Sequence, residues 1–236
     1  MSYDFKGRLK EGLDHLELSL PDDSIRSLEI YFNELKKWGG KINLIARSSS
    51  DEEILENHFI DSLTILPLLE KTDSHLLDVG TGAGFPGLVC KTVLPDLKVT
   101  LVEPRQKRVS FLRHITRTLG LQDVTVLDCR IEDEARLPSA SSFTHITSRA
   151  VSDIKAFMVM VGRFSAGGAR VICMKGPKWQ VEVADTAQVL SETYIQEEVI
   201  ELCLPFSGAR RALLVYAPGS LSENAFCPNF SLFPKK

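Results

Sequence analysis

Residues 78–87 read DVGTGAGFPG and directly follow the residues HLL at 75–77. Four glycines in ten residues, after a run typical of a buried strand, predict a turn from strand into helix. Glycines let backbone N–H groups approach a ligand without side chains in the way. We therefore expect this stretch to be the ligand loop of an α/β domain. A tight turn that binds no ligand is the alternative.

A dinucleotide is one ligand that the loop could hold. Gly82, Gly84 and Gly87 satisfy the G-x-G-x-x-G fingerprint of dinucleotide-binding domains. Glu103 lies about 20 residues further on, where the fingerprint places the acid that binds the ribose. This interpretation predicts an NAD-dependent oxidoreductase.

A second register of the same loop favours S-adenosylmethionine. Gly80, Gly82 and Gly84 follow Asp78 in the pattern of class I methyltransferase loops. An acid at the end of the strand suits a ligand with an ammonium group and would repel a pyrophosphate. Pro86 lies inside the dinucleotide register and removes an N–H group that a pyrophosphate would use. We therefore prefer the methyltransferase register and keep the oxidoreductase as the alternative.

The N-terminal part of the chain has helical periodicity. Apolar residues at helical spacing predict a helix over 24–38, and serine caps followed by acids predict a second helix over 48–70. Pro67 is expected to kink or end the second helix. Residues 1–72 are therefore predicted to form a helical extension packed on the core.

From residue 75 onward, strands alternate with helices, which is typical of βαβ units and a parallel sheet. Strands are predicted at 75–79, 99–103, 124–128, 143–149 and 169–176, with helices at 86–94 and 105–119. Strands at 194–205 and 209–218 flank a short Phe-Ser-Gly turn and predict an antiparallel hairpin. The expected fold is α/β: a Rossmann-like class I S-adenosylmethionine-dependent methyltransferase domain over 73–218, with a mostly parallel seven-stranded sheet. Residues 219–236 are expected to form a peripheral tail.

The composition is that of an ordinary soluble globular protein. The 236 residues are 44% hydrophobic and 25% charged, with a formal net charge of −3. No apolar run reaches the roughly 18 residues that span a membrane, and the N-terminus has no apolar signal core. We therefore expect a cytoplasmic protein without a membrane partner. Five widely spaced cysteines without a CxxC pair predict buried, reduced thiols and no metal site.

Several motifs together resemble one family. They are NLIARSSSDEEILENHFIDSLTILP at 43–67, LLDVGTGAGFPG at 76–87, LVEPRQKRVSFLR at 101–113, SRA at 148–150 and MKG at 174–176. This set is similar to the bacterial small-subunit ribosomal RNA guanine-N7 methyltransferases, also called glucose-inhibited division protein B. The resemblance implies transfer of a methyl group from S-adenosylmethionine to N7 of guanine 527 in 16S ribosomal RNA.

The same resemblance implies a set of cofactor residues. Gly80 and Phe85 would contact S-adenosylmethionine, Ile131 and Glu132 would flank the adenine, and Arg149 would reach the cofactor. The residues themselves point to the same edge, since ligands of open α/β sheets bind at the carboxyl ends of the strands. Glu103, at the end of the second strand, could accept hydrogen bonds from both ribose hydroxyls. Asp78, Gly82 and Gly84 complete the cofactor set.

Three of these residues also have an alternative interpretation in which they do not bind the cofactor. Glu103 could be a solvated loop acid. Glu132 is one of several acids in a charged stretch. Arg149 could form a salt bridge to a nearby acid, because an arginine at the end of an apolar strand needs an anionic or planar partner.

The sequence lacks two signatures of other methyl acceptors. No cysteine lies in the Pro-Cys motif that supplies a thiolate for methylation at carbon 5 of a pyrimidine, and no Asn/Asp-Pro-Pro-aromatic loop follows the fourth strand. Guanine N7 has a free lone pair, so its methylation requires positioning and electrostatics more than a base. No catalytic residue is assigned with certainty; Arg149 and Lys175 are positioning candidates.

Basic residues near the loop edge are candidates for RNA contact. Arg47, Lys175 and Lys178 could neutralise phosphates of 16S ribosomal RNA or of the small ribosomal subunit. His58 and Asp61 lie three residues apart on a predicted helix and share a face; core or capping roles are as plausible for them as RNA contact. The protein is expected to be a monomer.

Overall fold

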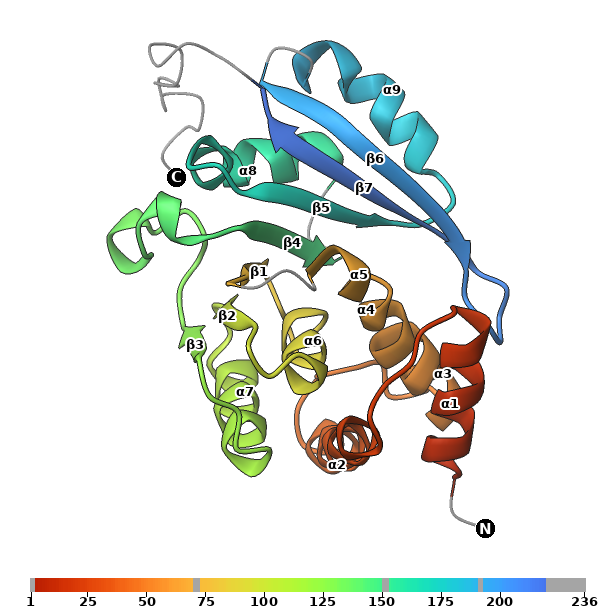
Figure 1. The fold of residues 1–236 in the computed structure, drawn as a ribbon. Helices are drawn as coiled ribbons and strands as arrows, with labels where there is room; N and C mark the ends of the chain where they lie inside the picture. The colour runs from red at the N-terminus through yellow and green to blue at the C-terminus, as the bar shows by residue number, and fades with distance from the viewer. Residues whose placement is uncertain (1–2, 70–72, 150–152, 191–192, 220–236) are drawn as a thin grey trace.

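A computed structural model describes residues 3–69, 73–149, 153–190 and 193–219. In this part of the chain, seven strands form one sheet in the order β3-β2-β1-β4-β5-β7-β6 (Figure 1). The first five strands in chain order are parallel, and β7 is antiparallel to both β5 and β6. The predicted α/β sheet with a C-terminal antiparallel hairpin is confirmed.

The strands lie close to their predicted ranges. Their bounds are β1 His75–Val79, β2 Lys98–Val102, β3 Val124–Leu127, β4 His145–Arg149, β5 Arg170–Lys175, β6 Tyr194–Cys203 and β7 Arg210–Pro218. Successive side chains of β1 point to opposite faces: Leu76 joins one core, and Leu77 and Val79 join the other. Both faces of the sheet are therefore buried, as the apolar strand sequences require.

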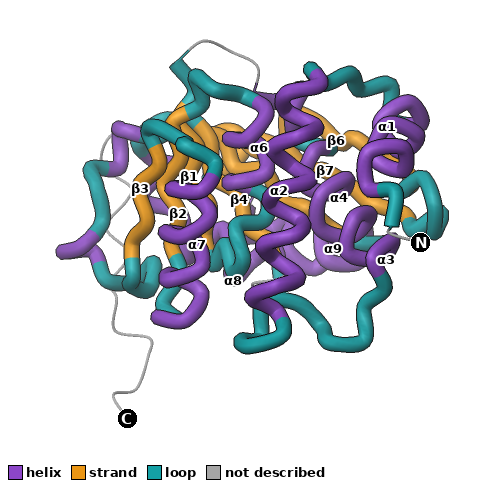
Figure 2. Tube along the Cα trace, turned by 90° about the horizontal axis from the view of Figure 1, so that it is seen from below, coloured by secondary structure: helices purple, strands orange, loops and turns teal. Residues whose placement is uncertain are grey.

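Helices cover both faces of the sheet. One face carries α1 (Phe5–His15), α2 (Asp22–Gly39), α6 (Gly87–Val93) and α7 (Gln106–Thr118), which share a core and lie in front of the strands in Figure 2. The other face carries α8 (Ile154–Ala166) and α9 (Trp179–Leu190). Short 3₁₀ turns lie at Glu134–Arg136 and Ala140–Ser142. The N-terminal helices thus pack on the sheet face that also carries α6.

The predicted helix at 48–70 is more irregular than expected. It consists of α3 (Asp51–Ile54), a π-helix (Leu55–Ile60), α4 (Asp61–Leu63) and α5 (Leu66–Leu69). Ser50 caps the start in a capping box with Glu53. The prediction that Pro67 kinks or ends the helix is confirmed: α4 ends at Leu63 and α5 begins at Leu66, with Pro67 in its first turn. In a first turn the missing N–H group of proline has no helical partner to lose.

Cys203 corrects the prediction of buried thiols. Cys90, Cys129 and Cys173 are buried and unpaired, but Cys203 is exposed on the edge strand β6. Most side chains of β6 are exposed or half-buried, so the faces of the sheet are incompletely covered at this strand. Cys227, Ala150 and the tail 220–236 lie outside the described residues.

Within the residues described, no cluster of His, Cys, Asp and Glu could hold a metal ion. No helix in the same part of the chain is long and apolar enough to cross a membrane.

Candidate functional site

The glycine loop connects β1 to α6 and depends on left-handed backbone at three glycines. The φ angles are 67° at Gly80, 64° at Gly82 and 98° at Gly84. A Cβ atom at Gly84 would lie 2.2 Å from the hydroxyl oxygen of Tyr31, so this position is closed by packing. A Cβ atom at Gly82 would lie no closer than 3.8 Å to another heavy atom. The loop is therefore tightly held at Gly84 and has room at Gly82.

Asp78 holds the glycine loop from the interior of the protein. The carboxylate is fully buried, and its Oδ2 accepts hydrogen bonds from Thr81 Oγ1 at 2.6 Å and from the Gly87 N–H group at 2.8 Å. Its Oδ1 has no hydrogen-bond partner among the described residues. The predicted ammonium-binding acid is therefore, in the structure, first a buried anchor for the start of α6.

Glu103 faces the loop from the end of β2. Its Oε2 accepts a hydrogen bond from the Gly82 N–H group at 3.0 Å, and its Oε1 accepts one from the Arg105 N–H group at 2.9 Å. Arg108 lies 3.5 Å from Oε2. The side chain is buried, so the alternative of a solvated loop acid is wrong. A carboxylate oxygen has more than one lone pair, so each oxygen can still accept a ligand hydroxyl.

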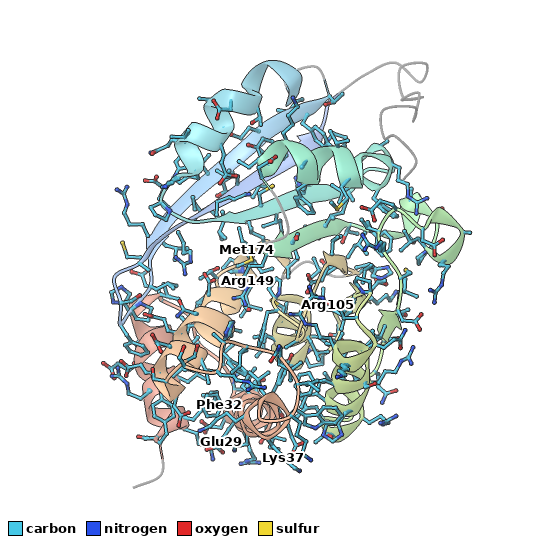
Figure 3. All side chains as sticks on the ribbon, turned by 180° about the vertical axis from the view of Figure 1, so that it is seen from behind. Glu29, Phe32, Lys37, Arg105, Arg149 and Met174 are labelled. Carbon is cyan, nitrogen blue, oxygen red and sulfur yellow. The ribbon has the colours of Figure 1, made fainter. Side chains whose placement is uncertain are left out.

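Arg149 is the last residue of β4 and lies where the sheet meets the N-terminal helices; in Figure 3 it appears beside Met174 of β5. Its guanidinium donates hydrogen bonds to the Asn57 carbonyl oxygen, to Asp61 Oδ2 at 3.3 Å and to His58 Nδ1 at 2.8 Å. Arg211 of β7 donates to the other oxygen of Asp61, from Nε to Oδ1, at 3.0 Å. We call these five residues the Arg149 cluster.

The Arg149 cluster bears on two sequence predictions, one for Arg149 and one for the shared face of His58 and Asp61. The alternative for Arg149, a salt bridge to a nearby acid, is present in the structure and involves Asp61. Asp61 is only 5% exposed and binds Arg149 and Arg211, so its carboxylate faces protein instead of solvent. His58 and Asp61 do share a face, as predicted, and that face is turned to Arg149.

An aromatic stack joins the cluster to the glycine loop. The ring of Phe85 stacks on His58 with centroids 4.9 Å apart and on Tyr31 with centroids 5.9 Å apart. The guanidinium carbon of Arg149 lies 5.2 Å from the Phe85 ring centroid. Tyr31 donates a 2.5 Å hydrogen bond to the Ala83 carbonyl oxygen. Phe85 is 5% exposed, so protein covers most of its ring.

The loop and Arg149 meet at the switch point of the sheet. The chain runs from β1 to β2 on one side, whereas β4 lies on the other side of β1. In open α/β sheets, ligands bind outside the carboxyl ends of the strands at such a point. Besides Asp78 Oδ1, the buried Ser148 Oγ beside Arg149 lacks a partner among the described residues. These orphaned oxygens, the room at Gly82 and the lone pairs of Glu103 fit a ligand rich in hydroxyl and amino groups.

Comparison with known proteins identifies the family. The family model for GidB, rRNA small subunit methyltransferase G, matches residues 24–212. The chain belongs to this family. It is 51% identical over 216 residues to the ribosomal RNA small subunit methyltransferase G of Desulfotalea psychrophila, covering 91% of this chain and 99% of that protein. It is 37% identical over 209 residues to the protein of the same name from Syntrophus aciditrophicus, covering 88% and 87%.

Solved structures agree on the fold. TrmN from Thermus thermophilus has a TM-score of 0.52 at 17% identity, covering 70% of this chain and 53% of that protein. TrmK from M. capricolum, solved with S-adenosyl-homocysteine, has a TM-score of 0.53 at 9% identity, covering 69% and 71%. Membership of the methyltransferase G family confirms an rRNA methyltransferase, and the oxidoreductase alternative is not supported.

In this member of the methyltransferase G family, the other site residues predicted from the sequence differ in how exposed they are. Ile131 is buried and Glu132 is exposed, both shortly after β3. Lys175 ends β5 and forms an ion pair with Glu182 at 2.8 Å. Lys178 is exposed in the turn before α9, and Arg47 is exposed in the connection between α2 and α3.

Three contacts of the site were missed by sequence reasoning. The carbonyl of Asn57, the hydroxyl of Tyr31 and the guanidinium of Arg211 have no local signature. Tyr31 lies on the apolar face of α2, where only a core role is evident. Arg211 could have been noticed by the argument applied to Arg149, because it directly precedes the apolar run ALLVYA at 212–217 of the same strand.

Ionisation of Asp78 is expected to make stability depend on pH. Burial raises the pKa of Asp78 to about 7 from an ordinary value of 3.8. The folded protein then binds this proton more tightly than the unfolded chain, so the stabilisation is complete below about pH 4 and is lost as pH rises through about 7. Asp78→Asn should remove this component. Urea unfolding of both proteins between pH 5 and pH 8 should show the stability of the wild type falling relative to the variant, whereas parallel profiles would contradict the assignment.

Proposed function

We propose that this protein transfers a methyl group from S-adenosylmethionine to N7 of a guanine in 16S ribosomal RNA, guanine 527 by family resemblance. The proposal rests on one observation: the glycine loop and Arg149 lie close together at the switch point of the sheet. S-adenosylmethionine supplies an electrophilic methyl group on a sulfonium. The protein then has to bind and orient the cofactor and the guanine, and to exclude water.

Among the described residues we assign no group as a base, which suits N7 chemistry. Guanine N7 uses its own lone pair to form the new N–C bond, while the electron pair of the C–S bond remains on sulfur, so no proton is moved. His58, the imidazole nearest to Arg149, accepts a hydrogen bond at Nδ1, and burial together with the Arg149 charge lowers its pKa to about 3. Burial raises the pKa of the thiols of Cys90 and Cys173, which opposes thiolate formation. The site therefore works by positioning.

The cofactor is assigned to the residues around the loop. Gly80, Gly82 and Gly84 let it lie against backbone, and Glu103 accepts from its ribose hydroxyls. Phe85, Ile131, Glu132 and Arg149 provide the further contacts that the family resemblance implies. Asp78 shapes the loop through Oδ2, and its Oδ1 is assigned to the cofactor.

RNA binding is assigned to the same edge of the sheet. Arg47, Lys175 and Lys178 contact phosphates, and Lys175 exchanges Glu182 for one of them. Residues 1–72 act as a helical extension of the methyltransferase domain at 73–218. The protein acts as a cytoplasmic monomer on the small ribosomal subunit or its RNA.

Transfer of labelled methyl to unmodified small ribosomal subunits tests this function. We expect label in 16S ribosomal RNA on one guanine, located by chain cleavage specific for N7-methylguanine. Naked 16S ribosomal RNA in a parallel reaction identifies the preferred substrate. A product on another base atom would overturn the N7 assignment. Binding of NAD without binding of S-adenosylhomocysteine, measured by calorimetry, would overturn the cofactor.

A further inference from the structure

His58 is held in one tautomer by the Arg149 cluster. Its Nδ1 lies 2.8 Å from Nη2 of Arg149. A guanidinium is a donor only, so Nδ1 must present its lone pair, and the ring proton is on Nε2. Stacking on Phe85, with an interplanar angle of 16°, fixes the plane of the ring. The structure thus determines both the orientation and the proton position of His58.

His58 also stays neutral. A second proton would have to occupy Nδ1, where Arg149 already donates and where two positive charges would meet. Asp61, the acid nearest to this pair, binds Arg149 and Arg211 instead of the imidazole. The low pKa of about 3 agrees with this geometry.

The donor on the other side of the ring has no partner within the part of the chain that the structure describes. No hydrogen bond from Nε2 is made to a described residue, although the side chain is half-buried at the edge of the glycine loop. A fixed donor without an acceptor, beside a predicted ligand site, indicates an acceptor on the ligand.

We propose that His58 is a neutral hydrogen-bond donor that binds the O6 carbonyl of the acceptor guanine through Nε2–H. This role rests on the proposed guanine-N7 transfer. O6 lies next to N7 on the same edge of guanine, whereas adenine presents an amino donor at this place. A donor there selects guanine and leaves the N7 lone pair free for the methyl group.

Neutrality of His58 has a physical reason in the reaction. When the N7–C bond forms and the C–S bond breaks, the positive charge moves from sulfur to the purine. A charged donor at O6 would repel that developing charge, whereas a neutral imidazole N–H does so much less. No proton leaves His58 during the step.

Three variants at position 58 separate donation from packing. His58→Gln keeps an N–H donor, His58→Phe keeps the ring that stacks on Phe85, and His58→Ala keeps neither. In single-turnover methyl transfer to small subunits, we expect His58→Phe and His58→Ala to be slower by about 10-fold, and His58→Gln to stay within about 3-fold of wild type. The affinity for S-adenosylhomocysteine and the urea midpoint are measured for each variant to identify changes in cofactor binding or folding.

A change in the RNA identifies the acceptor atom. Small subunits are reassembled with 2-aminopurine at the mapped guanine, because this base keeps N7 and lacks O6. With that RNA, wild type and His58→Phe should react at the same rate within about 2-fold. Activity of His58→Phe equal to wild type on guanine, or an unchanged defect on 2-aminopurine, would overturn the proposal. Failure of the wild type to produce N7-methylguanine would instead overturn the function itself.

Discussion

Asp61→Asn is expected to lower the free energy of unfolding by about 3 kcal/mol, because it leaves two mostly buried guanidinium groups without their carboxylate. Asp61 Oδ2 and Oδ1 bind Arg149 and Arg211, and the three side chains are 7%, 17% and 21% exposed in the order Asp61, Arg149, Arg211. An asparagine of the same shape keeps one acceptor and loses the charge. Urea unfolding at neutral pH measures the change.

The same variant should reduce single-turnover methyl transfer by about 100-fold, since displacement of a positioning group by about 1 Å can have that effect. Asp23→Asn is the matched control, because Asp23 forms an exposed ion pair with Arg26 at 3.0 Å on α2. Exposed pairs contribute little to stability, so this control should behave as wild type. Equal stability and activity of the two variants would show that the Arg149 cluster does not depend on Asp61.

Gly84→Ala is expected to have an effect of similar size, again about 3 kcal/mol of unfolding free energy, and to abolish cofactor binding. Two causes add: the φ angle of 98° strains an alanine, and its Cβ would lie 2.2 Å from the Tyr31 hydroxyl and 2.9 Å from Leu88 Cβ. Tyr31 cannot move away easily, since it is fully buried and bonded to the Ala83 carbonyl. Urea unfolding and calorimetry with S-adenosylhomocysteine test both effects.

Gly168→Ala separates the two causes. Gly168 has a φ angle of 103°, close to that of Gly84, and a Cβ there would meet nothing within 4 Å. We expect this control to lose about 1 kcal/mol from backbone strain alone. Adding Tyr31→Phe to Gly84→Ala should restore part of the lost stability, because it removes the oxygen in closest contact. Equal losses for the two alanine variants would contradict the role assigned to Tyr31.

Local patterns in the sequence were sufficient to predict the sheet, the hairpin and the glycine loop. The apolar run before the loop, the alternation of strands with helices, and glycines where φ is positive are properties of neighbouring residues. The five motifs between residues 43 and 176, taken together, also predicted the family, which the family model over residues 24–212 confirms. The preference for a methyltransferase over an oxidoreductase, argued from Asp78 and Pro86, agrees with the family, and the structure adds that Asp78 anchors α6.

The arrangement around Arg149 could be decided only by the tertiary structure. Its partners Asn57, His58 and Asp61 are about ninety residues away in the chain. Asn57 and His58 lie on a π-helix that periodicity alone did not predict, and Asp61 begins α4 directly after it. Arg211 arrives from the antiparallel strand that closes the sheet. Which charged groups share a buried carboxylate depends on how whole elements pack, because desolvation and Coulomb attraction act through space without regard to chain distance. The sequence by itself therefore determined the loop and its cofactor class. Packing decided which side chains orient Arg149 and which ring nitrogen of His58 carries the proton.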